Sequence, residues 1–125
     1  MEVRGIEFPA PAKRLSLNDR LHWRKRHELE QVWQMAAFVA ARNAKLKGLG
    51  PSVVNITYVV QHHRRRDPHN FAATSKPILD GMVQAGVWPD DNSDWVTVND
   101  PVFWVNAASV KRTGEWVRVE IEEIT

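Results

Sequence analysis

The chain contains no cysteine, which excludes a disulfide framework and any metal site built on thiolates. It has no run of about 20 apolar residues, which excludes a membrane-spanning helix of ordinary length. Residues 1–14 lack the apolar core of a secretory signal peptide. These absences predict a protein of the cell interior, cytoplasmic and without a membrane partner.

The chain also lacks a large excess of either charge, because its formal net charge is only +2. The distribution of charge is more informative than its total. One basic cluster comprises Arg20 and residues 24–27, and a second spans residues 62–66, whereas acids gather at residues 90–94 and in the last strand. Basic clusters beside a local group of acids fit a metal-dependent enzyme that acts on phosphates, with solvated surface charge as the alternative.

The chain has 125 residues, near the commonest size of one domain, so we assign residues 1–125 to a single domain. A helix is predicted over residues 26–47 by apolar residues at three- and four-residue spacing. The members of that face are Leu29, Val32, Trp33, Ala36 and Ala40. A second helix is predicted to follow an irregular turn, with Ser75 as its cap, Pro77 in its first turn and Gly86 just beyond its end.

Five strands are predicted from runs rich in β-branched and aromatic residues. They cover residues 3–8, 53–60, 95–98, 102–110 and 116–124. The last two are expected to form an antiparallel pair around a turn at residues 112–114. The resulting order, β-α-β-α-β-β-β, predicts an α+β domain in which a mixed or antiparallel sheet packs with two main helices.

The stretch from Arg64 to Asp91 carries the residues best suited to chemistry. Asp67 follows a predicted strand, and Asp91 follows the predicted second helix, so acids at both ends of that helix could converge on one divalent cation. Such an ion activates water and neutralises charge on phosphorus, and Lys76 could stabilise the charged transition state. The alternative is that Asp67 caps a turn while Asp90 and Asp91 decorate a surface loop.

The same stretch resembles the RusA family of Holliday-junction resolvases. That family's pattern is an arginine run, an Asp-x-Asp-Asn group, a helix with Lys and Asp four apart, then Ala-Gly with an aromatic, and a final Asp-Asp. The corresponding residues here are Arg64-Arg65-Arg66, Asp67-Pro68-His69-Asn70, Lys76 with Asp80, Ala85-Gly86-Val87-Trp88 and Asp90-Asp91. The N-terminal segment with Asn18, Arg20, His22 and Trp23, ahead of a long helix, is also similar to the family.

The resemblance implies roles for individual residues. Asp67 and Asp91 would be catalytic carboxylates that bind Mg²⁺, and Lys76 would be the catalytic lysine. Asp80 would support the site or supply a third carboxylate, with Asn70 and Asp90 in supporting positions. The family acts as a homodimer that cuts branched DNA, and a two-fold dimer matches the symmetry of a junction.

Two features depart from the family pattern. The second acid of the Asp-x-Asp pair is His69, and three more residues lie between Asn70 and Lys76 than the pattern contains. A neutral imidazole is a poorer Mg²⁺ ligand than a carboxylate but serves Mn²⁺ better. His69 could be a metal ligand, act on a water or leaving oxygen, or be an ordinary loop histidine.

Basic and aromatic residues supply the remaining candidates for DNA contact. Arg64, Arg65 and Arg66 are expected to hold the phosphate backbone, and Arg24 and Lys25 form a second candidate contact. Tryptophans can stack on unpaired bases, but apolar patterns place most of them in the core. We expect core positions for Trp33, Trp95 and Trp104, and consider Trp88 a possible contact with DNA or a partner subunit.

The main hypothesis is a Mg²⁺-dependent endodeoxyribonuclease, with Mn²⁺ as a possible substitute. It would hydrolyse phosphodiesters in branched DNA (junctions, flaps and replication forks) during recombination and repair in a bacterial or phage-infected cell. The first alternative is a branched-DNA binding protein that has lost cleavage, which the histidine at position 69 motivates. A metal-binding regulator whose basic face contacts a protein is the other alternative.

Overall fold

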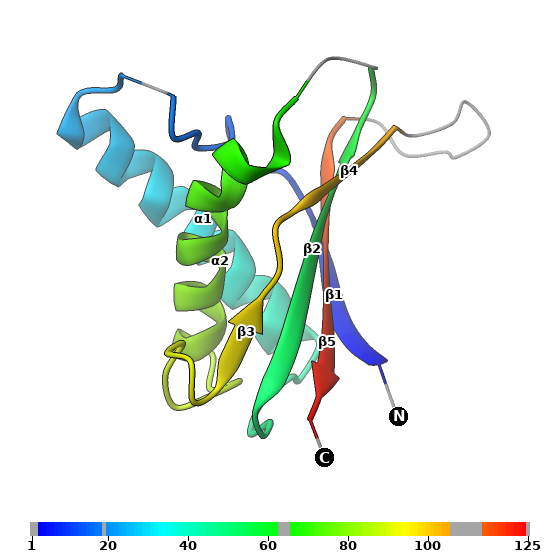
Figure 1. Ribbon diagram of the computed structural model, residues 1–125. Helices are drawn as coiled ribbons and strands as arrows, with labels where there is room; N and C mark the ends of the chain where they lie inside the picture. The colour runs from blue at the N-terminus through cyan, green and yellow to red at the C-terminus, as the bar shows by residue number, and fades with distance from the viewer. Residues whose placement is uncertain (1–2, 19, 63–65, 106–113, 125) are drawn as a thin grey trace.

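The computed structural model describes residues 3–18, 20–62, 66–105 and 114–124. Its elements follow the predicted order, with one additional 3₁₀ helix before the second α-helix (Figure 1). They are β1 (Val3–Pro9), α1 (Trp23–Asn43), β2 (Ser52–Val60), η1 (Pro68–Phe71), α2 (Ala72–Gln84), β3 (Val96–Val98), β4 (Val102–Val105) and β5 (Trp116–Glu123). Both α-helices lie on one face of a five-stranded mixed sheet, so the fold is α+β as predicted. Within the described ranges, no helix is both long and apolar enough to cross a membrane.

Strand β2 is the centre of the sheet. β5 runs antiparallel to it along one side, and β1 in turn pairs antiparallel with β5. On the other side, β3 and β4 pair in parallel with the first and second parts of β2. The predicted antiparallel pairing of residues 102–110 with 116–124 is therefore wrong for the described residues, because β2 lies between β4 and β5.

Helix α1 begins earlier and ends earlier than the predicted range of 26–47. The imidazole Nδ1 of His22 accepts a hydrogen bond from the backbone N–H of Arg24, which satisfies one of the donors left open at the helix start. At the other end, Lys45 adopts a positive φ of 55°, which stops the helix before Gly48. The predicted buried face is also shifted, because Val32 is exposed whereas Ala37 and Ala41 are fully buried.

Helix α2 begins at Ala72, so the prediction that Ser75 caps it is wrong. Asp67 instead caps η1, which runs directly into α2, and Ser75 lies buried inside the helix. Pro77 is therefore an interior residue of the helix. Its ring removes one backbone hydrogen bond, a cost that burial of the helix against α1 offsets. Gly86 has a φ of 90° and follows the helix end as predicted.

The core lies between the sheet and the two helices. Trp33 is fully buried there, and its indole N–H donates to the carbonyl of Lys13 at 2.9 Å. Trp88 is also buried, with its indole N–H bonded to the Ser52 hydroxyl, so the expectation that it contacts DNA or a partner is wrong. Trp95 is partly buried against the core, but Trp104 is 44% exposed, contrary to prediction, because β4 is an edge strand.

Candidate functional site

Lys76, Asp80 and Asp91 form the most connected group of charged side chains near α2, and we refer to them as the Lys76 cluster. The ammonium Nζ of Lys76 lies 2.9 Å from Asp80 Oδ1 and 2.5 Å from Asp91 Oδ2. Lys76 and Asp80 are one helical turn apart on α2, which places both side chains on one face. The loop after α2 returns along that face and brings Asp91 to the same ammonium.

The electrostatics of the Lys76 cluster follow from these contacts. The hydrogen bond from Lys76 lowers the pKa of the Asp91 carboxyl below its ordinary value of 3.8. The same contact, with a smaller contribution from Asp80, raises the pKa of Lys76. The Asp91 side chain is only 15% exposed, whereas the side chains of Lys76 and Asp80 are 63% and 38% exposed. The shifts favour the charged forms of both Lys76 and Asp91 at neutral pH, and the cluster is open to solvent on the Lys76 side.

The loop that carries Asp91 is held by its own polar side chains. Asp90 Oδ1 accepts a hydrogen bond from the backbone N–H of Asp91, and its other oxygen accepts one from the Asn92 side chain. The Asn92 side chain in turn accepts from the backbone N–H of Asp94. These bonds hold the backbone of the loop at Asp91 and Asp94.

Asp67 and His69 lie at the other end of the α2 region, where Asp67 is the N-cap of η1 and His69 lies within it. Asp67 Oδ1 accepts a hydrogen bond from the backbone N–H of His69, and this bond caps the 3₁₀ helix. The His69 imidazole Nδ1 lies 3.6 Å from Asp100 Oδ1, and both side chains are exposed. The backbone of Asn70 bonds to the carbonyl of Asp67 and to the N–H of Leu17, which anchors the turn.

The predicted metal ligands are thus brought together only in part. Asp80 and Asp91 converge on one cationic centre, as a pair of ligands would. Among the residues that the structure describes, no three His, Asp or Glu side chains are grouped closely enough to hold a metal ion. Asp67 and His69 therefore do not join Asp80 and Asp91 in a three-ligand set. The carboxylates of Asp80 and Asp91 meet at Lys76, whereas the carboxylate of Asp67 caps η1 separately.

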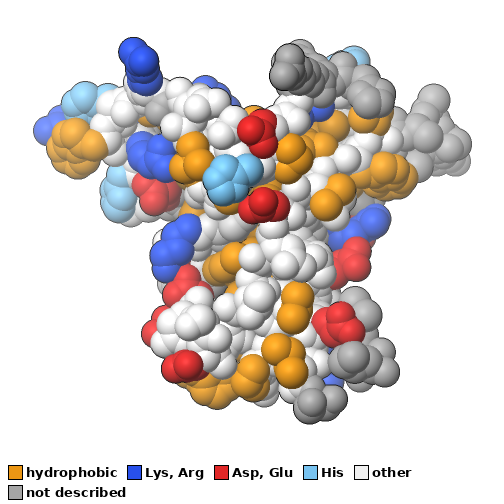
Figure 2. Space-filling view, viewed as in Figure 1, with side chains coloured by type: hydrophobic (Ala, Val, Ile, Leu, Met, Phe, Trp, Pro, Cys, Tyr) orange, Lys and Arg blue, Asp and Glu red, His pale blue; other side chains and the backbone are white. Residues whose placement is uncertain are grey.

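The predicted basic contacts have different surroundings. Arg64 and Arg65 lie outside the described residues. The guanidinium of Arg66 lies over the ring of Phe103, 5.1 Å from its centroid, and donates to the carbonyl of His62. Arg24 and Lys25 are exposed in the first turn of α1, where Lys, Arg and His side chains gather in Figure 2. Positive charge at a helix N-terminus opposes the helix dipole, so these residues do not stabilise α1 and are open to an anionic ligand.

Two residues of this region were given no site role from the sequence, although Trp23 belongs to the N-terminal segment that resembles the RusA family. Trp23 is 67% exposed at the start of α1, with the Arg24 guanidinium 5.2 Å from its ring centroid. Arg14 packs on the rings of Phe71 and Phe103 and forms a 2.7 Å ion pair with Glu115. Arg14 thereby ties η1 to β4. Nothing in the surrounding sequence indicates that contact, since the residues involved are far apart along the chain.

The lowered pKa of Asp91 predicts a dependence of stability on pH. Because the folded-state pKa lies below the ordinary value of 3.8, the ion pair with Lys76 stabilises the fold above about pH 4. That contribution is lost as the pH falls through the folded-state pKa. We expect Asp91→Asn to be less stable than the natural chain at neutral pH, with a difference that shrinks in acid. Urea unfolding at a series of pH values measures this, and a difference that stays constant into acid would contradict it.

No protein-family model matches the chain. The search of curated proteins also found no match.

Proposed function

We propose that this chain is a divalent-metal-dependent endodeoxyribonuclease of the RusA type that acts on branched DNA. The observation that carries the proposal is the convergence of Asp80 and Asp91 on Lys76. Two carboxylates and a lysine at one point are groups that metal-dependent phosphodiester hydrolysis can use. The resemblance of residues 64–91 to the RusA pattern supplies the choice of DNA as the substrate.

The two carboxylates fit a magnesium site of the kind that protein and substrate share. Mg²⁺ is commonly held by one or two carboxylates, with water and substrate phosphate completing an octahedron. Asp80 and Asp91 already hold a positive group between them, so the same oxygens suit a divalent cation. When bound, the ion would supply Lewis acidity toward the scissile phosphate.

For a cation to bind between Asp80 and Asp91, the Lys76 ammonium must break its contact with at least one of these carboxylates. Its side chain is 63% exposed and flexible, and only one turn of helix separates it from Asp80. A phosphate oxygen can replace the lost carboxylate as its partner. In this proposal Lys76 keeps the two acids together in the free protein and then stabilises negative charge on the reacting phosphate.

Asp67 remains a proposed catalytic carboxylate and His69 a proposed ligand or proton-transfer group. Both side chains are exposed, so DNA phosphate or a second ion can reach them. Asp67 caps η1 through its Oδ1 atom. Arg66 follows the strand end and precedes Asp67 directly, so it is suited to hold a phosphate beside them. Arg24 and Lys25 would extend the contact with the DNA backbone, and this contact conveys shape rather than base sequence.

A branched-DNA binding protein without cleavage is the rival function. Two observations favour it. The described residues contain no three-ligand metal group, and position 69 holds an imidazole where a carboxylate would be expected. This rival predicts junction binding that does not require a metal and no cutting with any divalent cation.

A cleavage assay separates the two functions. Labelled four-way junction, flap, fork and linear duplex are each incubated with the natural chain in Mg²⁺, Mn²⁺ or EDTA. We expect cutting of branched substrates with Mg²⁺ or Mn²⁺, little cutting of duplex, and none in EDTA. Binding is measured on the same substrates at rising salt, where affinity should fall steeply because phosphate contacts release counterions. Tight junction binding with no cutting in either metal would leave the binding protein as the function.

A further inference from the structure

Trp23 is an exposed aromatic residue to which neither the core nor the proposed chemistry gives a role. It is the first residue of α1 and is 67% exposed, more than any other large hydrophobic residue that the structure describes. Because most of the indole is in water, its removal should cost the fold little. Exposure alone is ordinary for a surface residue, so the surroundings of the indole decide whether it has a ligand.

Two neighbouring side chains hold the indole in position. The imidazole of His22 lies 5.7 Å from the Trp23 ring between centroids, with an interplanar angle of 30°. The guanidinium of Arg24 lies 5.2 Å from the same ring. The imidazole is itself held, because its Nδ1 accepts a hydrogen bond from the backbone N–H of Arg24 at 3.2 Å. A flat surface that is positioned before binding loses little conformational entropy when a ligand stacks on it.

The surroundings of the indole are positively charged. The first turn of α1 contains no acidic residue. Arg26 forms an ion pair with Glu30 at 3.9 Å, but within the described ranges the exposed cations closest to Trp23 in the sequence have no ion pair. We refer to Trp23, His22 and these cations as the Trp23 surface, and the cations are Arg20, Arg24 and Lys25. The surface therefore combines an open aromatic face with positive charge that no acid neutralises.

A nucleobase with its flanking phosphates matches both parts of the Trp23 surface. Any base can stack on an aromatic side chain, and the phosphates on either side can meet the cations. The face of a base is open for stacking only where the base is unpaired, which excludes the interior of a duplex. A lipid surface fits less well, because insertion needs a contiguous apolar face and residues 24–28 contain no apolar side chain.

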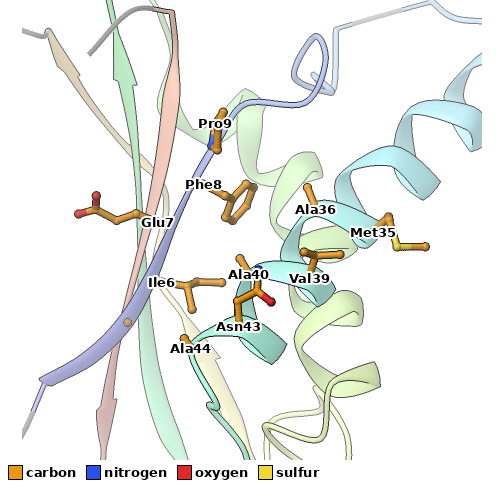
Figure 3. A pocket seen from close by; sticks show the side chains of 11 residues that line it. Ile6, Glu7, Phe8, Pro9, Met35, Ala36, Val39, Ala40, Asn43 and Ala44 are labelled. Carbon is orange, nitrogen blue, oxygen red and sulfur yellow. The ribbon is translucent and has the colours of Figure 1, made fainter. Parts of the chain in front are cut away.

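A larger apolar surface of α1 lies farther along the helix, and its chemistry is different. A groove of about 670 Å³ separates α1 from β1, with Met35 on its helical side. Figure 3 shows Ile6 and Phe8 pointing toward the helix, whereas Glu7 points to the other side of the strand. Among the described residues that line the groove, Glu7 is the one with a charged side chain. The groove offers no cation to a phosphate, so a nucleic acid favours the Trp23 surface.

The chain connects the Trp23 surface to η1. The backbone N–H of Leu17 donates to the carbonyl of Asn70 at 2.8 Å, and Asn70 follows His69 in η1. Six residues lead from Leu17 to Trp23, and a segment of that length spans at most about 22 Å. About six stacked nucleotides, at about 3.4 Å each, cover the same distance. One DNA strand can therefore contact η1 and the indole together.

We propose that Trp23 stacks on an unpaired base of branched DNA while Arg20, Arg24 and Lys25 hold the phosphates beside that base. This inference rests on the proposed function, because it names the kind of branched DNA that is preferred, but it requires DNA binding and no cleavage. It selects DNA with a single-stranded arm, such as a flap or a fork, over a fully paired four-way junction or a duplex. Trp23 is in this view a specificity-determining residue and not a catalytic one.

Equilibrium binding in EDTA tests the proposal without cleavage. Anisotropy of labelled DNA should show that the natural chain binds a flap more tightly than a duplex. Trp23→Ala should weaken flap binding about 10-fold and change duplex binding by less than about 2-fold, because only the flap offers a base for stacking. Trp23→Phe keeps an aromatic face and should retain most of the affinity, whereas Trp23→Leu should not. Trp104→Ala is the matched control, since it removes an indole that is 44% exposed on the edge strand β4.

Two further readouts separate stacking from a general loss of charge. A stacked base quenches indole fluorescence, so oligothymidylate should quench the emission of the natural chain and of Trp104→Ala but hardly that of Trp23→Ala. In a plot of log affinity against log salt, Trp23→Ala should keep the natural slope. Lys25→Ala should reduce the slope by about 1, because it removes one phosphate contact.

The outcomes distinguish this inference from the proposed function. Equal flap binding by the natural chain and Trp23→Ala would overturn the inference and leave the nuclease standing. Trp23-dependent flap binding without cutting in any metal would support the inference and remove the nuclease. A natural chain that binds no DNA would overturn both. Blue-shifted emission with anionic phosphatidylglycerol vesicles, without quenching by oligothymidylate, would assign Trp23 to a lipid surface instead. A Tm of Trp23→Ala several degrees below the natural value would also count against the inference, because the indole would then serve the fold.

Discussion

Replacing Asp91 with asparagine should reduce metal-dependent cutting of branched DNA by at least about 100-fold, the usual cost of removing one preorganised electrostatic group. The side chain keeps its shape but loses the charge that Lys76 and a cation both require. Junction affinity should be unchanged or slightly higher, because a negative charge near the DNA phosphates is removed. Loss of cutting with binding retained would assign Asp91 to the reaction rather than to DNA contact.

Asp94→Asn is the matched control for this variant. Asp94 lies in the same loop, its side chain is exposed, and its backbone N–H donates a hydrogen bond to the Asn92 side chain. We expect cutting by Asp94→Asn at the natural rate. Thermal unfolding of both variants checks that the loss in Asp91→Asn exceeds any loss of folded protein. If Asp91→Asn cuts as fast as the natural chain, Asp91 has no part in catalysis and the Lys76 cluster is a structural ion pair.

The second large effect is a loss of folding stability, which we expect from Gly81→Ala. A Cβ at Gly81 would lie 2.2 Å from the Gln34 carbonyl oxygen and 2.9 Å from the Phe38 amide nitrogen. Both atoms belong to the α1 backbone, so no side-chain rotation relieves the contact. The helices would have to separate, and overpacking of this kind costs about 3 kcal/mol or more. For a domain of this size the Tm should fall by roughly 10 °C or more.

Gly50→Ala provides the comparison for Gly81→Ala. Its Cβ would meet only the Glu123 carboxylate at 3.5 Å, an ordinary contact with a side chain. We expect its free energy of unfolding to stay within about 0.5 kcal/mol of the natural value. Circular dichroism melting of both variants is sufficient to compare them. An unchanged Tm in Gly81→Ala would mean that α1 and α2 cross farther apart than the structure describes. Separation of these helices would also move Lys76 and Asp80, which share α2 with Gly81.

The local parts of the site could be predicted because they depend on short spacings. Lys76 and Asp80 are four residues apart in a segment whose apolar pattern is helical, so their contact follows from helix geometry. Gly86 similarly marks the helix end, because its φ of 90° suits glycine. Ser75 was misassigned as a cap for a local reason. A serine ahead of proline is typical of a helix start, but here Asp67 and η1 begin the helical segment earlier.

Long-range pairing explains the remaining errors. Two β-rich segments separated by a short loop are typical of a hairpin, yet the last strand pairs with β2 and β1 instead. β2 offers nine residues of mostly buried, β-branched sequence, so pairing with it buries more apolar surface than a local hairpin would. Exposure of Trp104 follows from the same arrangement, because it leaves β4 at an edge.

The sequence by itself determined the number and order of the α-helices and strands, and it determined that Lys76 and Asp80 share one face. Those features depend on hydrophobic period, turn residues and spacings of a few residues, all of which are local. Only the tertiary structure decided that Asp91 joins Lys76 and that Val32, Met35 and Val39 of α1 stay exposed. Each of these depends on where the chain returns after a loop, and such contacts are selected by total burial and hydrogen bonding over the whole domain.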